Sequence, residues 1–195
     1  NCRAYDPCFA GEFAVILDHG MRQMMERQED VFYYVTVMNE NYAQPSLPTG
    51  VEADIVKGLY RFAVHDVKGK AKGRVRLLGS GTILREVLAA ADLLEQEFGV
   101  PADVFSVTSF SELRREAIDA ERWNMLHPAG PARTPYVRQC LEGHEGPFVA
   151  ATDYMRAVPD QVRQWVPGRY HVLGTDGYGR SDSRAALRGF FEVDR

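Results

Sequence analysis

The chain has 195 residues, of which 45% are hydrophobic and 26% charged, and its 23 basic and 27 acidic side chains leave a formal net charge of −4. This composition excludes an intrinsically disordered chain, a collagen-like repeat and a disulfide-stapled small domain. The mildly acidic balance also argues against a nucleic-acid-binding or anionic-membrane-binding protein.

The chain termini and the cysteines bear on the cellular compartment of the protein. The chain begins at Asn1 rather than Met, so either its ends have been processed or it is a segment of a longer protein, which we favour. It shows no signal peptide and no apolar run long enough for a membrane helix. Cys2, Cys8 and Cys140 form no C-x-x-C pair, and we expect free thiols in the cytoplasm. The histidines show no recognised metal-ligand spacing, so no metal site is predicted.

The first elements are a helix and a strand. Asp6-Pro7 predicts the N-cap and first turn of a helix over 8–27. Its apolar stripe is formed by Phe9, Phe13, Ile16, Leu17, Met21 and Met24. The β-branched and aromatic run Val31–Met38 predicts a strand buried on both faces, with no earlier strand to pair with it.

The rest of the chain alternates between strands and helices after an aperiodic stretch over 39–54. We expect strands over 57–67 and 74–78, joined by a basic hairpin turn at 68–73, and further strands over 103–108, 147–153 and 170–173. We expect helices over 82–98, 111–126 with Ser111 as N-cap, 159–166 with Val162, Trp165 and Val166 inward, and 181–191 with Ser181 as N-cap. This order predicts a three-layer α/β/α fold with a mostly parallel sheet and helices on both faces.

Two glycine motifs lie where ligands or nucleophiles occur in α/β proteins. The turn Leu78-Gly79-Ser80-Gly81 between strand and helix could cradle a phosphate, but Leu84 stands where the dinucleotide fingerprint needs a third glycine. We interpret it as a tight turn. Gly179-Arg-Ser-Asp-Ser183 differs from a nucleophile elbow at its last position and is interpreted as a turn before a capped helix.

Charged residues in the middle of the chain give no catalytic set. Asp119 and Glu121 belong to a predicted helix whose solvated face explains them better than acid–base chemistry does. We therefore assign no catalytic, cofactor-binding or metal-binding residue to this chain.

Seven strings together resemble one enzyme family. They are Tyr5-Asp-Pro7, Asn39-Glu-Asn-Tyr42, Leu77-Leu-Gly-Ser-Gly81, Ser106-Val-Thr-Ser-Phe-Ser-Glu-Leu113, Glu121-Arg-Trp-Asn-Met-Leu-His-Pro128, Ala151-Thr-Asp-Tyr-Met155 and Leu173-Gly-Thr-Asp-Gly-Tyr-Gly-Arg-Ser-Asp-Ser-Arg184. The chain resembles the C-terminal part of the homodimeric, thiamine diphosphate-dependent decarboxylating components of bacterial pyruvate dehydrogenase complexes. It is more distantly similar to transketolase C-terminal domains.

This resemblance implies a domain division and a parent activity. Residues 1–45 would be the tail of the pyrimidine-binding middle domain, 46–55 a linker and 56–195 a transketolase-like C-terminal domain. The parent would be an oxidoreductase of a multienzyme complex, which decarboxylates pyruvate on thiamine diphosphate and magnesium and acetylates lipoyl groups on a dihydrolipoyl acetyltransferase core.

The resemblance assigns no active-site residue to this chain. The family's Gly-Asp-Gly…Asn cofactor motif is absent from the sequence. The segment is expected to be inactive alone and to bind no cofactor. It would supply scaffold, dimer contacts and, near Asn39–Tyr42, part of the active-site rim of the parent enzyme. Two alternatives stay open: a stand-alone anion-binding or regulatory module that uses Gly79–Gly81, and a transketolase C-terminal domain.

Overall fold

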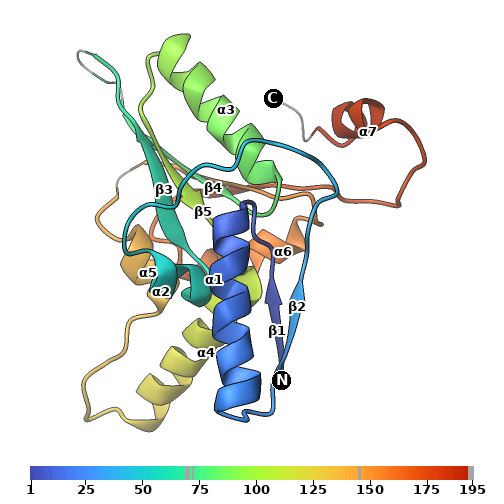
Figure 1. Cartoon of the computed structure of the whole chain (residues 1–195). Helices are drawn as coiled ribbons and strands as arrows, with labels where there is room; N and C mark the ends of the chain where they lie inside the picture. The colour runs from blue at the N-terminus through green and yellow to red at the C-terminus, as the bar shows by residue number, and fades with distance from the viewer. Residues whose placement is uncertain (69–70, 72, 145, 193–195) are drawn as a thin grey trace.

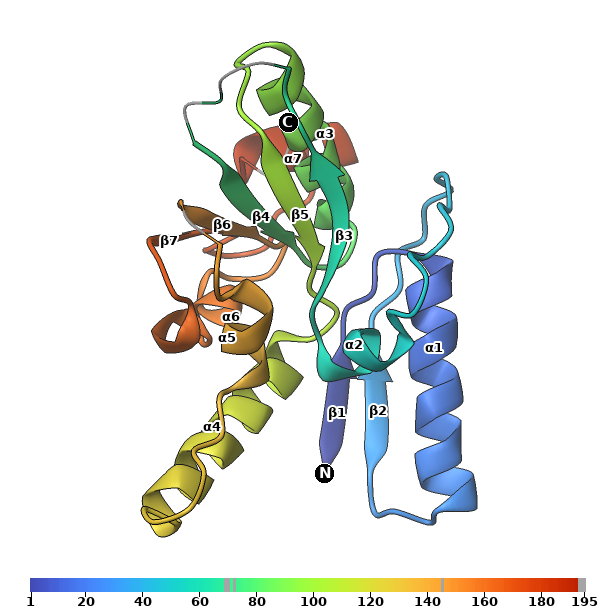
Figure 2. The same ribbon diagram turned by 90° about the vertical axis from the view of Figure 1, so that its left-hand side faces the viewer.

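The main sheet has five strands, four of them parallel. The computed structural model describes residues 1–68, 71, 73–144 and 146–192. The strands are β3 (Tyr60–His65), β4 (Val75–Gly79) and β5 (Ala102–Ser106), which Figure 1 labels, and β6 (Phe148–Ala151) and β7 (Tyr170–Leu173). They lie in the order β3-β5-β4-β6-β7, as Figure 2 shows. Only β3 is antiparallel, and it lies at one edge. The predicted mostly parallel sheet is confirmed.

Helices cover both faces of this sheet because successive side chains of a strand point to opposite sides. Leu77 joins a core cluster with residues of α3 (Ile83–Gln96). Its neighbour Leu78 joins another, with residues of α4 (Phe110–Leu126), of α5 (Tyr136–Leu141) and of the 3-10 turn Arg163–Trp165. The three-layer prediction is therefore confirmed, although α5 was not expected.

The last third of the chain contains shorter elements. Val162, Trp165 and Val166 are buried as predicted, after the short helix α6 (Ala157–Asp160). The final helix, α7 (Arg184–Phe190), has no buried residue among those described. No helix in the described part of the chain combines the length and hydropathy needed to cross a membrane.

The N-terminal segment is a complete β-α-β unit, so the prediction that no strand precedes its helix is wrong. Strand β1 (Cys2–Tyr5) pairs in parallel with β2 (Phe32–Val35). Between them lie α1 (Ala10–Met21) and a π-helical turn over Arg22–Glu26. The sequence Cys-Arg-Ala-Tyr has no apolar run, which is why the strand has no signature of its own.

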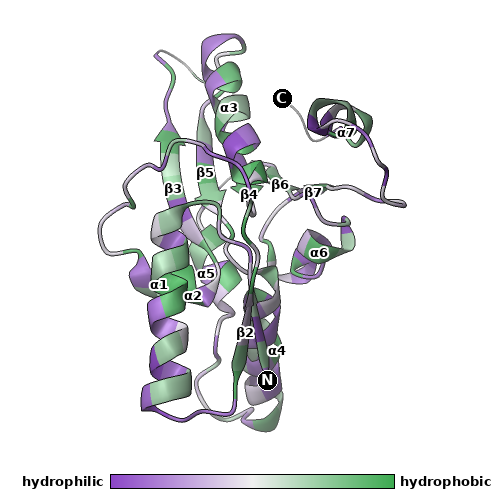
Figure 3. Ribbon diagram, turned by 45° about the vertical axis from the view of Figure 1, so that its right-hand side comes forward, coloured by the Kyte–Doolittle hydropathy of each residue, from purple (hydrophilic) through white to green (hydrophobic). Residues whose placement is uncertain are grey.

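Strand β2 is covered on one face only in this chain, whereas burial on both faces was predicted. The Tyr33 ring packs so closely against α1 that a Cβ added to Gly20 would lie 3.2 Å from its carbons. The alternate side chains Phe32 and Tyr34 are 58% and 60% exposed, on a strand that carries mostly hydrophobic residues (Figure 3). A two-stranded sheet offers no further layer on that side.

Glu12, rather than Asp6, caps α1, which begins later than predicted. One carboxylate oxygen of Glu12 accepts hydrogen bonds from the backbone N–H groups of Cys8 at 2.7 Å and Phe9 at 3.0 Å. The other accepts from the hydroxyls of Tyr60 at 2.7 Å and Ser106 at 2.5 Å. The Glu12 side chain is fully buried. One carboxylate thus joins α1 to β3 and β5 of the main sheet.

The N-terminal segment and the main sheet share hydrophobic cores. Cys8 and Phe9 belong to the same buried cluster as Leu84 and Val104. A smaller cluster combines Tyr5 and Ile16 with Ile55 and Tyr60. Ile55 lies on α2 (Glu52–Lys57), a short helix that begins within the last residues of the stretch 39–54 predicted to be aperiodic. Figure 2 shows α2 beside α1 and the β1–β2 pair.

The predicted hairpin over 57–78 is wrong. Strands β3 and β4 are consecutive in sequence, but β5 lies between them and pairs with both. Residues 69, 70 and 72 of the predicted turn lie outside the described residues. The glycine- and lysine-rich turn indicates that the chain reverses there, but not which strand occupies the neighbouring position.

Two helix caps lie two residues from their predicted positions. The N-cap of α4 is Ser109, whose hydroxyl accepts from the Glu112 N–H at 3.0 Å, and not Ser111. The N-cap of α7 is Ser183, which accepts from the Ala186 N–H at 3.3 Å, and not Ser181. Each motif contains two serines with the same capping chemistry, and the backbone path decides between them.

We expect Glu12→Gln to lower the free energy of unfolding by about 3 kcal/mol, because an amide cannot accept hydrogen bonds on its nitrogen and would leave buried donors unpaired. Chemical denaturation measures the change. Glu26→Gln, an exposed substitution just after α1, is the matched control and should change stability little. Equal effects of the two substitutions would contradict the role of Glu12.

Ser109→Ala should cost about 1–2 kcal/mol of stability, because it removes the cap of α4. It also removes a 2.6 Å hydrogen bond to the carbonyl of Ala4. Ser111→Ala should cost less than about 0.5 kcal/mol, since its contact with that carbonyl is long. Denaturation midpoints of both variants measure the two effects. A larger loss of stability for Ser111→Ala would indicate that Ser111, as predicted from the sequence, is the N-cap of α4.

Candidate functional site

The order of the strands points to one edge of the main sheet as the place for a ligand. From β4 the chain crosses to β5 on one side, and later returns to β6 on the other side of β4. In open α/β sheets ligands bind at the carboxyl ends of the two strands between which the order reverses. Here these strands are β4 and β6, which are followed by Gly79–Gly81 and by Thr152 and Asp153.

This position is filled by Asp6 from the N-terminal segment. The Gly81 N–H donates to the backbone carbonyl of Asp6 at 2.9 Å, and the Asp6 N–H donates to Thr108 at 2.7 Å. A Cβ added to Gly81 would lie 2.6 Å from a carboxylate oxygen of Asp6. The Ser80 hydroxyl is buried and donates to the Thr152 hydroxyl at 3.0 Å. The turn is closed by an acidic side chain, which favours the tight-turn interpretation over the anion-binding alternative.

The Asp6 carboxyl group has an unusual electrostatic environment. Burial raises its pKa from 3.8 to about 6, against a hydrogen bond that Thr36 donates to one oxygen. The nearby Asp153 carboxylate raises this pKa further, and burial also raises the pKa of Asp153 itself. Among the described residues the other oxygen, Oδ2, has no hydrogen-bond partner. A phosphate would add further negative charge at this point.

The predicted rim at Asn39–Tyr42 separates into two kinds of residue. Asn39 and Asn41 are exposed, whereas Glu40 and Tyr42 are half-buried. Glu40 forms ion pairs with Arg85 at 3.4 Å, Arg184 at 3.0 Å and Arg188 at 3.4 Å. The Tyr42 hydroxyl donates to the carbonyl of Cys8, and the Arg85 guanidinium lies 4.3 Å from its ring centre. Glu40 and Tyr42 therefore fasten this segment to α3 and α7.

The longest resemblance motif, 173–184, builds a loop rather than a nucleophile. Asp176 accepts hydrogen bonds from the Arg156 backbone N–H at 2.8 Å and from its Nε at 2.6 Å. The Thr175 N–H donates to the carbonyl of Tyr154 at 2.8 Å. A groove of about 930 Å³ lies between this loop, the loop after β6 and α7. Ser183 caps α7, so the interpretation of this glycine motif as a turn before a capped helix holds with a different cap.

The charged residues in the middle of α4 are solvated, as predicted. Asp119 and Glu121 are exposed. Asp119 pairs with Arg133 at 3.7 Å, and Glu121 accepts a hydrogen bond from the indole Nε1 of Trp165 at 2.7 Å. Each carboxylate has a structural partner, which does not support acid–base chemistry.

Two groups of polar residues were not expected from the sequence. Glu12 joins Tyr60 and Ser106, and His65 lies beside Asp92 and Glu95. The first group joins α1 to β3 and β5, and the second joins β3 to α3. Asp92 and Glu95 share a face of a predicted helix, but no local pattern places a histidine beside them.

Two family models of known proteins match successive parts of the chain. Residues 58–194 match the family model of the transketolase-like TK C-terminal domain, and residues 1–45 match that of the pyruvate dehydrogenase E1 component middle domain. The chain is 58% identical to the pyruvate dehydrogenase E1 component of Pseudomonas aeruginosa and 53% identical to that of Escherichia coli K12, over 196 residues in each case. Both alignments cover 100% of this chain and only 22% of the relative.

The fold is also found in a solved transketolase. The structure from Leishmania mexicana matches with a TM-score of 0.61 and 16% sequence identity, over 100% of this chain and 23% of that one. At this identity the likeness concerns the fold alone.

The raised pKa of Asp6 predicts a pH-dependent stability. The folded state binds the Asp6 proton more tightly than the unfolded state, so this group favours folding at low pH and loses that contribution as pH rises from 3.8 through about 6. Asp6→Asn mimics the protonated form. We expect it to raise the free energy of unfolding by about 3 kcal/mol at neutral pH and by little below about pH 4.

Denaturation curves recorded across this pH range provide the measurement. Asp18→Asn is the control, because Arg22 holds the pKa of the exposed Asp18 below its ordinary value and the effect of the substitution should have the opposite sign. A difference between Asp6→Asn and the unsubstituted protein that does not vary with pH would contradict the assignment.

Proposed function

Because the chain belongs to the family of transketolase-like C-terminal domains, we propose that it forms the C-terminal part of a pyruvate dehydrogenase E1 component. In this proposal residues 1–45 complete the middle domain and the residues from 56 onward form the C-terminal domain. The middle-domain match and the identity to named E1 components along the whole chain support it. The transketolase alternative has only a likeness of fold in its favour.

The parent enzyme of this proposal is a cytoplasmic homodimer. It decarboxylates pyruvate on thiamine diphosphate and magnesium, and it acetylates the lipoyl groups of a dihydrolipoyl acetyltransferase core. The residues described here do not suit the cofactor: Asp6 fills the turn at the edge of the sheet, and its carboxylate would repel a diphosphate. No step of the reaction is therefore assigned to this chain.

The role that the chain would play is structural, and one observation carries it. The buried Glu12 carboxylate accepts two hydrogen bonds at the start of its own helix and two more from Tyr60 of β3 and Ser106 of β5, and so joins the N-terminal β-α-β unit to the main sheet. Such a connection holds the end of the middle domain at a fixed place on the C-terminal domain. The backbone of Asp6 makes a second connection between the two segments, through its hydrogen bonds with Gly81 and Thr108.

The exposed side of β2 supports a dimer or domain contact in the parent. Phe32 and Tyr34, which alternate along β2 and so lie on the same face, are both more than half exposed. Large apolar side chains clustered at a surface mark a place that another chain or domain covers. We propose that the remainder of the middle domain or the second subunit covers this face in the assembled enzyme.

A chimeric enzyme tests this function. The matching segment of the Pseudomonas aeruginosa E1 component is replaced by this chain, and pyruvate decarboxylation and lipoyl acetylation are measured together with the molecular mass in solution. We expect an active dimer. A second chimera carrying Glu12→Gln should be less stable to heat. A folded, dimeric chimera without activity would contradict the proposed role.

The chain by itself should neither bind the cofactor nor consume pyruvate. Calorimetric titration of the 195 residues with thiamine diphosphate and magnesium should give no saturable heat, because the Asp6 carboxylate occupies the turn at Gly79–Gly81 and would repel a diphosphate. Saturable binding at one site per chain would show that the cofactor site is partly built from these residues.

A further inference from the structure

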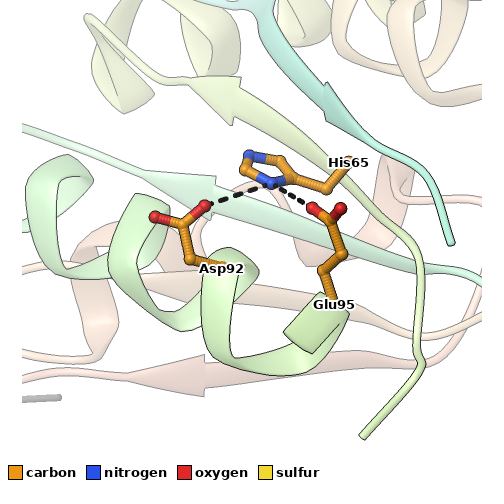
Figure 4. A group of neighbouring side chains, drawn as sticks. All are labelled: His65, Asp92 and Glu95. Atoms are coloured by element: carbon orange, nitrogen blue, oxygen red, sulfur yellow. Dashed lines mark hydrogen bonds and ion pairs between the residues drawn. The ribbon is translucent and has the colours of Figure 1, made fainter. Parts of the chain in front are cut away.

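A histidine and two carboxylates meet at one corner of the molecule, away from the junction described above. His65 is the last residue of β3, and Asp92 and Glu95 lie near the end of α3 (Figure 4). The Nδ1 atom of His65 lies 3.4 Å from an oxygen of Asp92 and 3.2 Å from an oxygen of Glu95. The three atoms all lie within 4.8 Å of one another.

The fold holds these three side chains in place. Pairing of His65 with Ala102 fixes the end of β3 against β5. Helix α3 packs on the same part of the sheet through Ala91, which is fully buried. Residues three apart on a helix are neighbours on its surface, so Asp92 and Glu95 project together beside the strand end. The His65 side chain is mostly buried, whereas the two carboxylates keep access to solvent.

The distances suit a bound cation. Ligands held at about 2.0–2.1 Å in a tetrahedral arrangement lie about 3.4 Å from one another. Both separations from the His65 nitrogen are close to this value. The Asp92 and Glu95 side chains are 58% and 38% exposed. They can therefore rotate until their two oxygens are also at this distance from each other.

The charges also suit a cation better than a proton. With a neutral imidazole the site carries two negative charges at close range. A protonated imidazole donates one hydrogen bond from Nδ1, and a single N–H cannot align with both carboxylates. A divalent cation accepts the nitrogen lone pair and neutralises both oxygens.

We propose that His65, Asp92 and Glu95 form a three-ligand site for a divalent transition metal of the zinc class. One imidazole nitrogen with two carboxylate oxygens is a set that zinc accepts, and it leaves a coordination position for water. The metal would connect the edge strand β3 to α3. The site lies on the transketolase-like domain and does not depend on the function proposed above.

Titration of the full chain with zinc chloride in a non-chelating buffer tests this site. We expect saturable binding of one zinc ion per chain and an unfolding temperature that rises with zinc concentration, because a ligand that binds only the folded state stabilises it. His65→Gln should weaken binding by at least about tenfold, and Asp92→Asn and Glu95→Gln should each weaken it as well. Circular dichroism verifies that each variant is folded.

Two controls separate this site from other zinc ligands of the chain. His171→Gln, at an exposed position on β7, should leave affinity and stoichiometry unchanged. The free thiols of Cys2, Cys8 and Cys140 are the other potential metal ligands. Cobalt bound at the proposed site should give a visible spectrum without a thiolate charge-transfer band, because this site contains no cysteine. Absence of saturable binding, full binding by His65→Gln, or a thiolate band would each overturn the proposal.

Discussion

The buried carboxylate of Glu12 is the interaction on which the arrangement of the molecule depends. An ionised carboxylate is costly to bury unless hydrogen bonds replace its water, and Glu12 receives four such bonds. The donors come from the start of α1, from β3 and from β5. The N-terminal unit cannot leave the main sheet without breaking two of these bonds and exposing Phe9 from a shared core. The two segments thus behave as one folded body.

Asp6 extends this connection to the edge of the sheet where a ligand would otherwise bind. The parallel topology creates a turn with free N–H groups between β4 and α3, and the chain satisfies the Gly81 N–H with its own backbone. The same contact buries the Asp6 side chain near Asp153, and this burial together with the Asp153 charge raises the pKa of Asp6, while its own burial raises the pKa of Asp153. Asp6 thus occupies a position where a ligand could bind and fixes the orientation of the two segments instead. This agrees with a structural role.

Local patterns in the sequence predicted the main sheet well, because buried strands and amphipathic helices have strong signatures. The run at 170–173 became β7 with the predicted bounds. What failed depends on distant partners. The pairing of β3 with β5 could not be inferred from the turn after β3, since strand order is set by how helices cover the sheet. Ser109 and Ser111 are equal as caps in sequence, and only the backbone path at the start of α4, which places the Ser109 hydroxyl on the Glu112 N–H, distinguishes them.

The polar junction left one sign in the sequence that could have revealed it. Glu12 lies three residues after Phe9 and four before Ile16, so it occupies the buried face of α1 among apolar neighbours. A charged residue on such a face needs buried hydrogen-bond donors, and the sequence does not show which residues supply them. Tyr60 and Ser106 could not be named, because they come from strands that meet only in the folded sheet. An exception to an apolar stripe therefore predicts that a junction exists, while its partners require the topology.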